Sequence, residues 1–199
     1  MTIAVTGPFA SGKSTFVEIL GELGAETVSA DEIVHHLLAE DEAAISRVVE
    51  RFGDEVRGEQ GVDRGTLGRK VFGDPEALQD LEHILHPLVR RETERRVAAS
   101  GAGLFVAEVP LLFEGVSGAD YDYTVAVTVP EERRRTWAAE RGVDEAALRA
   151  IEARQLGQEE KARRADVVVQ NDGGVDKLRR QAEELRERSL GGSVFQQEK

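Results

Sequence analysis

A glycine-containing segment near the N-terminus has the residue types and spacing needed to hold phosphate groups. Residues 7–14 read Gly-Pro-Phe-Ala-Ser-Gly-Lys-Ser and fit the pattern G-x-x-x-x-G-K-[ST]. In such a segment, backbone N–H groups and the start of the next helix surround anionic oxygens. Lys13 is expected to reach the β- and γ-phosphates, and the Ser14 hydroxyl to bind Mg²⁺. The segment predicts a nucleoside triphosphate site, against the alternative of an ordinary strand–helix turn.

Two carboxylates follow or end predicted strands and suit phosphoryl transfer. Asp31 follows the short run 27–29, and Glu108 lies near the end of the apolar run 104–109. Ligands of parallel α/β sheets bind at the carboxyl ends of the strands. Asp31 is therefore a candidate for orienting an attacking hydroxyl, and Glu108 for reaching Mg²⁺ or its water shell. The alternatives are a simple helix N-cap for Asp31 and a partly solvated strand-end acid for Glu108.

Basic residues gather between residues 131 and 164. Most are expected to be the solvated faces of helices, paired with nearby glutamates. One or two are expected to close over the transferring phosphate, because its charge must be neutralised away from water. The basic residues of this whole segment are Arg133, Arg134, Arg135, Arg141, Arg149, Arg154, Lys161, Arg163 and Arg164.

The histidines do not have the spacing of a metal site. His35 and His36 are adjacent, so they face different sides of a predicted helix. His83 and His86 have no acidic ligand at a suitable spacing. The chain also has no cysteine, which excludes disulfides, thiolate metal sites and cysteine nucleophiles.

Short apolar strands alternate with helical segments along the chain. This alternation predicts an α/β fold with a parallel sheet covered by helices on both faces. The glycine-containing segment lies between the first strand and an amphipathic helix at 14–23. The predicted strands span residues 3–6, 27–29, 104–109, 123–129 and 165–170.

The segment 32–99 is too long for a simple crossover and is predicted to be almost wholly helical. Asp63 and the pair Asp74-Pro75 are expected to begin helices, and Pro87 to begin another. This insertion is a candidate for holding a second substrate. Later in the chain, charged helices at about 131–141, 144–156 and 157–164 are expected to form a mobile cover, and a last helix to span 175–188.

Charge and hydropathy limit the classes of partner. The chain has 199 residues and a formal net charge of −12, without a basic tract, which argues against nucleic acid as a partner. No apolar run approaches the roughly 20 residues that a membrane-spanning helix needs. The residues before the first apolar stretch lack the basic start of a signal peptide. We therefore expect a single-domain cytoplasmic protein without nucleic-acid or membrane partners, its oligomeric state left open.

Together the motifs resemble those of the dephospho-coenzyme A kinase family, from residue 2 to about residue 185. Residues 7–15 resemble its phosphate loop, and Ser29 to His35 resemble its Asp-Ala-Asp-x-x-x-His segment. Residues 84–90 contain His-Pro-x-x-Arg, and residues 108–114 resemble its Asp-x-Pro-Leu-Leu-Phe-Glu signature. Its C-terminal pattern is matched in spacing by Gln155, Lys161, Ala165, Asp166, Asn171, Asp172 and Gly173.

Three positions depart from the family's pattern. Ser29 replaces the first aspartate of the Asp-Ala-Asp segment, so only Asp31 is left there to orient a hydroxyl. Glu108 replaces an aspartate, which keeps the charge and lengthens the side chain by a methylene. Ile151 stands where an arginine usually precedes Gln155 by four residues, and Arg149 or Arg154 is a candidate to substitute for it.

The resemblance implies a P-loop NTPase-type three-layer fold with a parallel five-stranded sheet, a helical acceptor-binding insertion and a helical lid. The implied reaction uses ATP with Mg²⁺ to phosphorylate the ribose 3′-hydroxyl of dephospho-coenzyme A, which gives coenzyme A and ADP. The implied parts of the single domain 1–199 are a core (about 1–31, 100–130 and 165–188), the insertion (about 32–99), the lid (about 131–164) and a loose tail (189–199).

Carried onto this sequence, the resemblance implies four sets of site residues. The catalytic set is Asp31, Lys13 and Arg141. The ATP-binding set is Gly7, Ala10, Ser11, Gly12, Lys13, Ser14, Thr15, Asn171 and Gly173, with the adenine near residues 171–173. The acceptor-binding set is His35, His86, Arg90, Glu108, Leu111 and Phe113. The metal set is Ser14 and Glu108.

Two rival functions remain at this point. One is another small-molecule kinase of the same superfamily, acting on a nucleoside monophosphate or a sugar acid. The other is a nucleotide-dependent switch or binding module. Guanine-specific switches usually carry an Asn-Lys-x-Asp element, whereas Asn171 is followed here by Asp172 and Gly173. The missing element argues against the switch.

Overall fold

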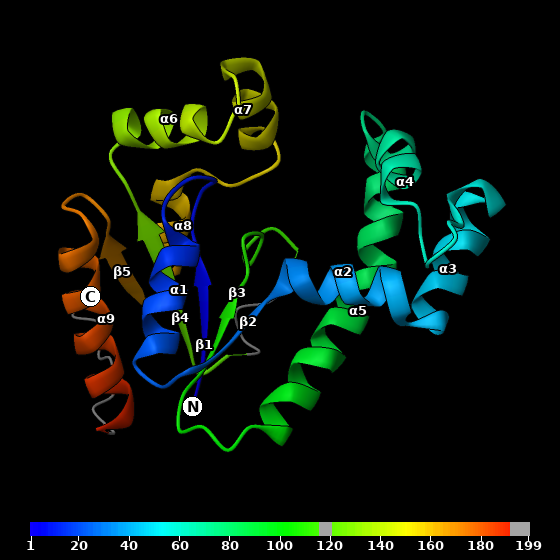
Figure 1. Ribbon diagram of the computed structural model, residues 1–199. Helices are drawn as coiled ribbons and strands as arrows, with labels where there is room; N and C mark the ends of the chain where they lie inside the picture. The colour runs from blue at the N-terminus through cyan, green and yellow to red at the C-terminus, as the bar shows by residue number, and fades with distance from the viewer. Residues whose placement is uncertain (116–120, 192–199) are drawn as a thin grey trace. The chain divides into compact units, whose positions relative to one another are not determined.

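A computed structural model describes residues 1–115 and 121–191. The chain divides into two compact units, of which one comprises Met1–Val28 with Ser100–Lys199 and the other Ser29–Ala99. We call them the core unit and the helical unit. Figure 1 shows the strands gathered in the core unit and helices alone through most of the helical unit.

The core unit is built on a five-stranded sheet with the order β2-β3-β1-β4-β5. Its strands are rich in Val, Ile, Ala and Thr, as expected for strands covered on both faces. The prediction of an α/β fold with a parallel five-stranded sheet is confirmed. The strands span Thr2–Thr6 (β1), Glu26–Ser29 (β2), Phe105–Glu108 (β3), Tyr123–Thr128 (β4) and Val167–Gln170 (β5).

The strand register brings together residues that are distant in sequence at the carboxyl ends of the strands. β1 runs parallel to β3, with Val5 opposite Glu108, and parallel to β4, with Thr6 opposite Ala126. The loop after Thr6 therefore begins beside the end of β3, where Glu108 lies. This register places a carboxylate next to the glycine-containing segment.

Helices cover both faces of the sheet. β1 leads through α1 (Lys13–Glu22) toward β2 on one side of the sheet, and β4 leads through α8 (Gln158–Arg164) to β5 on the other. Because parallel crossovers are right-handed, α1 and α8 lie on opposite faces. α9 (Val175–Leu190) packs against α1. The core between these two helices and the sheet contains Ile3, Val5, Phe16, Leu20, Val106, Val125, Leu178 and Leu185.

Two further helices stand above the carboxyl ends of the strands in Figure 1. They are α6 (Glu131–Glu140) and α7 (Glu145–Glu152), and with α8 they occupy the segment predicted as the lid. Asp144 caps α7 by accepting a hydrogen bond from the Ala147 N–H at 2.8 Å. Buried Ala138 and Leu148 join α6 and α7 in a small apolar cluster that also includes Ala10.

The helical unit contains α2 (Ala30–Glu40), α3 (Glu42–Phe52), a single 3₁₀ turn (Asp54–Val56), α4 (Arg64–Val71) and α5 (Pro75–Ala99). These elements pack around their own apolar core. That core includes Leu38, Ile45, Val48, Phe52, Val56, Val62, Leu67, Ala77 and Leu85.

Aspartate caps begin three helices of this unit. The Asp63 carboxylate accepts hydrogen bonds from the N–H groups of Gly65 and Thr66, as the sequence predicts. Asp74 accepts one from Ala77 before Pro75 opens α5, also as predicted. Asp41 caps α3 through the Ala44 N–H.

The prediction of a new helix at Pro87 is wrong, because α5 runs without interruption from Pro75 to Ala99. A proline inside a helix removes one backbone hydrogen bond and costs about 3 kcal/mol. Leu85 and Leu88, on either side of Pro87, are buried. We infer that the apolar packing of α5 against α2, α3 and α4 offsets this cost.

Two helix ends also differ from the sequence expectations. Ser29 is the N-cap residue of α2, so Asp31 lies in the first helical turn rather than at the cap. A carboxylate there is favoured by the positive end of the helix dipole. α9 continues two residues past the predicted end at 188, and Ser189, expected in a loose tail, is buried in it. The rest of that tail, 192–199, lies outside the described residues.

Candidate functional site

The segment between β1 and α1 forms a tightly bent loop, residues 7–12, which we call the phosphate loop. Gly12 has a φ of 87°, and a Cβ there would lie 2.2 Å from Nδ2 of Asn171. A Cβ on Gly7 would lie 2.4 Å from the carbonyl oxygen of Val127. Ala10 is also in the left-handed region, with φ of 60°, although it has a side chain. The loop therefore stores backbone strain that its surroundings must hold.

Hydrogen bonds from distant and from neighbouring parts of the chain hold the phosphate loop. Nδ2 of the buried Asn171, at the end of β5, donates to the Ser11 carbonyl at 2.9 Å. The Phe9 N–H donates to Oε1 of Gln155 at 3.2 Å. Nζ of the buried Lys13 donates back to the Pro8 carbonyl at 2.9 Å. Ser11 Oγ is buried without a hydrogen-bond partner among the described residues.

A hydroxyl and a carboxylate meet where the phosphate loop enters α1. Ser14 Oγ donates to Oε1 of Glu108 at 3.0 Å. This contact follows from the sheet register, which sets Glu108 beside the end of β1. Both groups are oxygen ligands of the kind that Mg²⁺ prefers. Among the described residues, no cluster of three or more His, Cys, Asp or Glu side chains has the geometry of a metal site.

A cavity of about 250 Å³ lies beside the phosphate loop. Trp137 of α6 forms an apolar wall, and Arg141 and Asn171 provide polar groups. Its residues come from the loop, the lid segment and the start of α9, so the fold builds it from three distant parts of the chain. The other lining residues are Gly12, Thr15, Glu140, Gly174, Val175 and Leu178.

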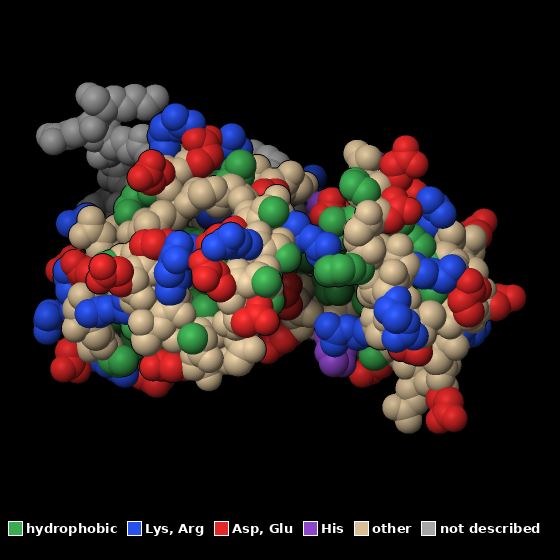
Figure 2. Space-filling view, turned by 90° about the horizontal axis from the view of Figure 1, so that it is seen from above, with side chains coloured by type: hydrophobic (Ala, Val, Ile, Leu, Met, Phe, Trp, Pro, Cys, Tyr) green, Lys and Arg blue, Asp and Glu red, His purple; other side chains and the backbone are tan. Residues whose placement is uncertain are grey.

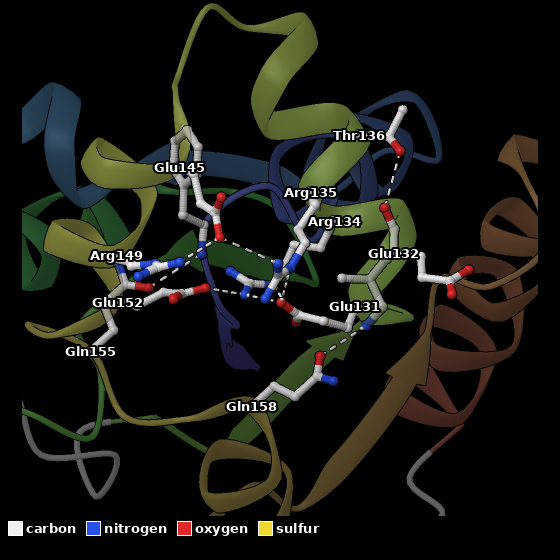
Figure 3. A network of polar contacts seen from close by, with 12 residues as sticks. Glu131, Glu132, Arg134, Arg135, Thr136, Glu145, Arg149, Glu152, Gln155 and Gln158 are labelled. Atoms are coloured by element: carbon white, nitrogen blue, oxygen red, sulfur yellow. Dashed lines mark hydrogen bonds and ion pairs between the residues drawn. The ribbon is translucent and has the colours of Figure 1, made fainter.

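Most arginines of α6 and α7 are engaged with glutamates, as the sequence suggests (Figure 3). Arg134 pairs with Glu131 at 2.9 Å and with Glu152. Arg149 pairs with Glu145 at 2.6 Å. Hydrogen bonds from Arg134, opposed by desolvation, lower the pKa of Glu131.

Arg141 differs from these arginines in its surroundings. Its guanidinium lies over the ring of Phe9 in the phosphate loop, with 6.0 Å from Cζ to the ring centre. It also lines the cavity beside the loop. Arg154 is exposed. Of the arginines predicted as candidates for closing over the phosphate, Arg141 therefore has the surroundings that fit this role best.

The predicted acceptor residues fall into both units. In the helical unit, Nδ1 of His35 lies 2.9 Å from Nη1 of Arg64, at the start of α4. Asp31 is exposed, His86 is partly buried within α5, and Arg90 pairs with Glu94 at 3.0 Å on the same helix. In this unit α2 and α4 thus bring His35 and Arg64 together.

Leu111 and Phe113 belong to the core unit, in the segment after β3. Both side chains are partly buried. The Phe113 carbonyl accepts a hydrogen bond from Nη1 of Arg164 at 3.2 Å. The Pro110 carbonyl, just before them, accepts one from Thr6 Oγ1 at 3.2 Å. We call residues 110–114 the post-β3 loop.

Within the core unit, the structure brings together Lys13, Ser14, Glu108, Asn171 and Arg141 around the phosphate loop. Sequence reasoning did not single out Trp137, although it is the only tryptophan in the chain. It also gave no role to Gln155, and it did not foresee the contact of Arg64 with His35. Spacing along the chain carries no signal for such contacts.

Among the described residues, no helix is sufficiently long and apolar to cross a membrane.

Comparisons with known proteins agree with the motifs. A family model described as Dephospho-CoA kinase matches residues 1–177. The dephospho-CoA kinase of Syntrophotalea carbinolica is 36% identical over 197 residues, covering 96% of this chain and 93% of that protein. The solved structure of TT1252 from Thermus thermophilus matches with a TM-score of 0.81 and 31% identity over 98% of each chain. The dephospho-CoA kinase from Campylobacter jejuni matches with a TM-score of 0.70 and 28% identity over 97% of this chain and 98% of that one.

Proposed function

This chain belongs to the dephospho-CoA kinase family, and from this premise we propose how its own residues carry out the reaction. It uses ATP to phosphorylate dephospho-CoA in coenzyme A biosynthesis. We propose that the acceptor atom is the ribose 3′-hydroxyl oxygen. The observation that carries the site assignment is the contact of Ser14 with Glu108 beside the buried Lys13. The cytoplasmic location expected from the sequence stays a prediction.

The triphosphate would lie in the phosphate loop. Backbone N–H groups of the loop and of the first turn of α1 would face its oxygens. The buried hydroxyl of Ser11, which has no hydrogen-bond partner in the described part of the chain, offers one more donor there. Lys13 would exchange its bond to the Pro8 carbonyl for the β- and γ-phosphates.

Ser14 and Glu108 fit a magnesium ion. They supply one hydroxyl and one carboxylate oxygen 3.0 Å apart, and Mg²⁺ usually takes few protein ligands and completes its shell with phosphate oxygens and water. When bound, the ion neutralises charge that develops on the transferring phosphoryl group. Ser14 would contact it directly, and Glu108 directly or through water.

The cavity beside the loop suits the adenine. Trp137 offers an aromatic face, and Asn171 and Gly174 approach from the segment between β5 and α9. The family resemblance implies an adenine near residues 171–173, and Asn171 lines this cavity. Arg141, over the Phe9 ring, is our candidate for closing on the phosphates.

In the helical unit, our candidates for contacting dephospho-CoA are His35, His86 and Arg90. In the core unit, they are Leu111 and Phe113 of the post-β3 loop. Asp31 would accept the proton of the attacking hydroxyl. The ribose oxygen then forms a bond to the γ-phosphorus while the bond from that phosphorus to the β–γ bridging oxygen breaks, and ADP leaves. The protein's contribution is mostly positioning and electrostatic stabilisation.

We expect Lys13→Ala to lower kcat by roughly 10²- to 10³-fold, since it removes a cation from the transferring phosphate. The measurement is ADP release with dephospho-CoA, AMP, CMP or shikimate as acceptor. Lys70→Ala is the matched control, because Lys70 lies in the helical unit, where it pairs with the exposed Glu55 at 2.6 Å. We expect it to retain wild-type turnover.

Near-normal turnover by Lys13→Ala would refute the role given to the loop lysine. Turnover by the wild-type protein with AMP, CMP or shikimate, and none with dephospho-CoA, would overturn the acceptor. Thermal melting of both variants shows whether a loss of turnover comes from unfolding.

A further inference from the structure

A fully buried lysine lies outside the residues assigned to ATP and the acceptor. Lys161 of α8 is 0% exposed, and its Nζ donates to Oε1 of Glu114 at 2.7 Å and to the Pro110 carbonyl at 2.8 Å. Burial lowers the pKa of Lys161, while the Glu114 carboxylate acts to raise it. Buried lysines are rare and costly unless paired. This pair fixes both ends of the post-β3 loop, residues 110–114, to α8.

Glu114 makes a second contact that reaches the lid segment. Its Oε1 also accepts the Leu156 N–H at 2.7 Å, while its Oε2 is buried without a partner among the described residues. A buried oxygen without a hydrogen-bond partner costs free energy. The surrounding contacts must therefore hold the Glu114 side chain in this position. The post-β3 loop is thereby held to residue 156 as well as to Lys161.

The residue before Leu156 reaches the phosphate loop. Oε1 of Gln155 accepts the Phe9 N–H at 3.2 Å, and Phe9 precedes Ala10, whose φ of 60° is strained. Gln155 and Leu156 therefore connect the phosphate loop to the post-β3 loop through two consecutive residues. We call these two residues the bridge. Figure 3 shows Gln155 in the segment that follows α7.

We propose that the bridge, anchored by the pair of Glu114 and Lys161, positions the phosphate loop from the post-β3 loop. Gln155, Glu114 and Lys161 are then positioning residues, which act on the reaction through the loops they hold. This inference rests on the proposed function, in which one loop binds the triphosphate and the other contacts the acceptor. A consequence is that acceptor binding and ATP binding strengthen one another, because both require the same loop arrangement.

A purely structural role makes a different prediction. If these contacts only stabilise the fold, losing one lowers the melting temperature and leaves substrate affinity unchanged. If the bridge positions the phosphate loop, losing its contact with Phe9 weakens nucleotide binding in a protein that remains folded. The two roles are separated by comparing two glutamines of the same segment.

The test compares Gln155→Met with Gln158→Met. Oε1 of Gln158 accepts the Val129 N–H at 3.1 Å, so it makes the same kind of contact, but with the residue that follows β4 and not with a residue of the phosphate loop. The substitution keeps a similar unbranched shape and removes the acceptor oxygen in both variants. Isothermal titration calorimetry measures binding of a non-hydrolysable ATP analogue with Mg²⁺, with and without dephospho-CoA.

We expect Gln155→Met to bind the analogue about tenfold more weakly than the wild type, which is the size of effect expected from the loss of one partly buried hydrogen bond. Dephospho-CoA should strengthen analogue binding in the wild type and in Gln158→Met, and less so in Gln155→Met. In turnover, KM for ATP should rise in Gln155→Met more than kcat falls. Both variants should melt within a few degrees of each other.

Equal analogue affinities for Gln155→Met and Gln158→Met would overturn the proposal. So would unchanged coupling to dephospho-CoA in Gln155→Met. The titration of the analogue alone needs no turnover, so it tests the bridge even if the wild-type protein does not phosphorylate dephospho-CoA. Absence of dephospho-CoA phosphorylation by the wild-type protein would refute the proposed function, and it would leave the titration of the analogue as a valid test of the bridge.

The anchor is tested with a double variant. Lys161→Met alone leaves Glu114 buried without its cation, and we expect a large loss of stability. Adding Glu114→Gln removes that charge and keeps an oxygen that can accept the Leu156 N–H. We expect the double variant to regain most of the melting temperature but to bind the analogue more weakly than the wild type, because the bonds from Lys161 to Glu114 and to the Pro110 carbonyl are absent. A double variant that is as stable as the wild type and binds the analogue as tightly would contradict the anchoring role.

Discussion

The phosphate loop and the lid helices α6 and α7 are both rich in polar contacts, but they differ in how those contacts are shielded. Around the phosphate loop, the bonds of Asn171 and Lys13 lie in buried surroundings. On α6 and α7, the pairs of Arg135 with Glu131 and of Arg149 with Glu145 are largely exposed. Water therefore cannot replace the bonds of Asn171 and Lys13 around the loop, whereas it replaces these two exposed pairs of α6 and α7 at little cost.

The exposed pairs follow from a surface where charges of both signs are mixed. Figure 2 shows Lys and Arg side chains interspersed with Asp and Glu over the face seen from above. An exposed ion pair contributes roughly 0 to 1 kcal/mol. Such pairs keep a helix soluble and allow it to change partners. The lid that the sequence predicts over residues 131–164 would benefit from contacts of this kind when it opens to release product.

Substitution of two glycines with left-handed backbones is expected to show the largest difference in unfolding free energy between the phosphate loop and the segment of α6 and α7. Gly12 has a φ of 87° and a Cβ there would clash with Nδ2 of Asn171, whereas Gly142, after α6, has a φ of 75° and open space around it. We expect Gly12→Ala to cost about 3 kcal/mol of unfolding free energy and Gly142→Ala about 1 kcal/mol. The first should also bind ATP more than tenfold more weakly.

Urea unfolding and calorimetric titration of an ATP analogue measure the two effects. Similar losses of stability for both variants, with similar ATP affinity, would show that backbone strain alone matters at Gly12. The close packing around the phosphate loop would then make no difference to the cost of a glycine substitution.

Two neighbouring arginines test the same contrast within the lid. The side chain of Arg134 is 7% exposed and joins Glu131 of α6 to Glu152 of α7, while Arg135 is 59% exposed. Nη1 of Arg134 is buried without a partner among the described residues. We expect Arg134→Gln to cost about 2 kcal/mol of unfolding free energy, since it removes a buried cation that joins two exposed carboxylates, and Arg135→Gln to cost at most a few tenths.

Urea unfolding of these two variants, in the same buffer, measures the difference. Equal losses of unfolding free energy would mean that the burial of Arg134 does not add to its contribution to stability. A high salt concentration should reduce the effect of Arg135→Gln further and that of Arg134→Gln much less, because screening acts mainly on exposed charges.

Local patterns in the sequence predicted the strands, the phosphate loop and the caps at Asp63 and Asp74. Each of these depends on residues within about one helical turn, so spacing is sufficient. The side-chain contacts that hold the phosphate loop join residues far apart in sequence: Asn171 to Ser11, and Gln155 to Phe9. No periodicity encodes them, since they arise only when the sheet brings its strand ends together.

The error at Pro87 has the same origin. The local signal of a proline favours a helix start, and the structure continues α5 because Leu85 and Leu88 are buried on either side. Tertiary packing outweighs propensity there. Trp137 was missed for a related reason: its value lies in the cavity that it lines with Asn171, and that cavity exists only in the folded core unit.

Two glutamates of α5, one shielded from solvent and one exposed, allow the same comparison in the helical unit. We expect the smallest difference in unfolding free energy for this pair. Glu92 is 15% exposed and bonds to Arg95 and Arg96, which lower its pKa from 4.5 to about 2, while Glu94 is 62% exposed and pairs with Arg90. A depressed carboxyl pKa contributes stability that is present above the unfolded value and is lost as the pH falls through the folded value.

We therefore expect Glu92→Gln to lower the unfolding free energy by about 1 kcal/mol at pH 7, with the full shift discounted because Arg95 is exposed to solvent. The difference from the wild type should shrink as the pH falls from about 4.5 toward about 2. Glu94→Gln should differ by a few tenths at most at every pH. Urea titrations across this pH range measure the unfolding free energy of both variants and of the wild type. If the curve of Glu92→Gln runs parallel to that of the wild type, the ion pairs of Glu92 are not the source of the pH dependence.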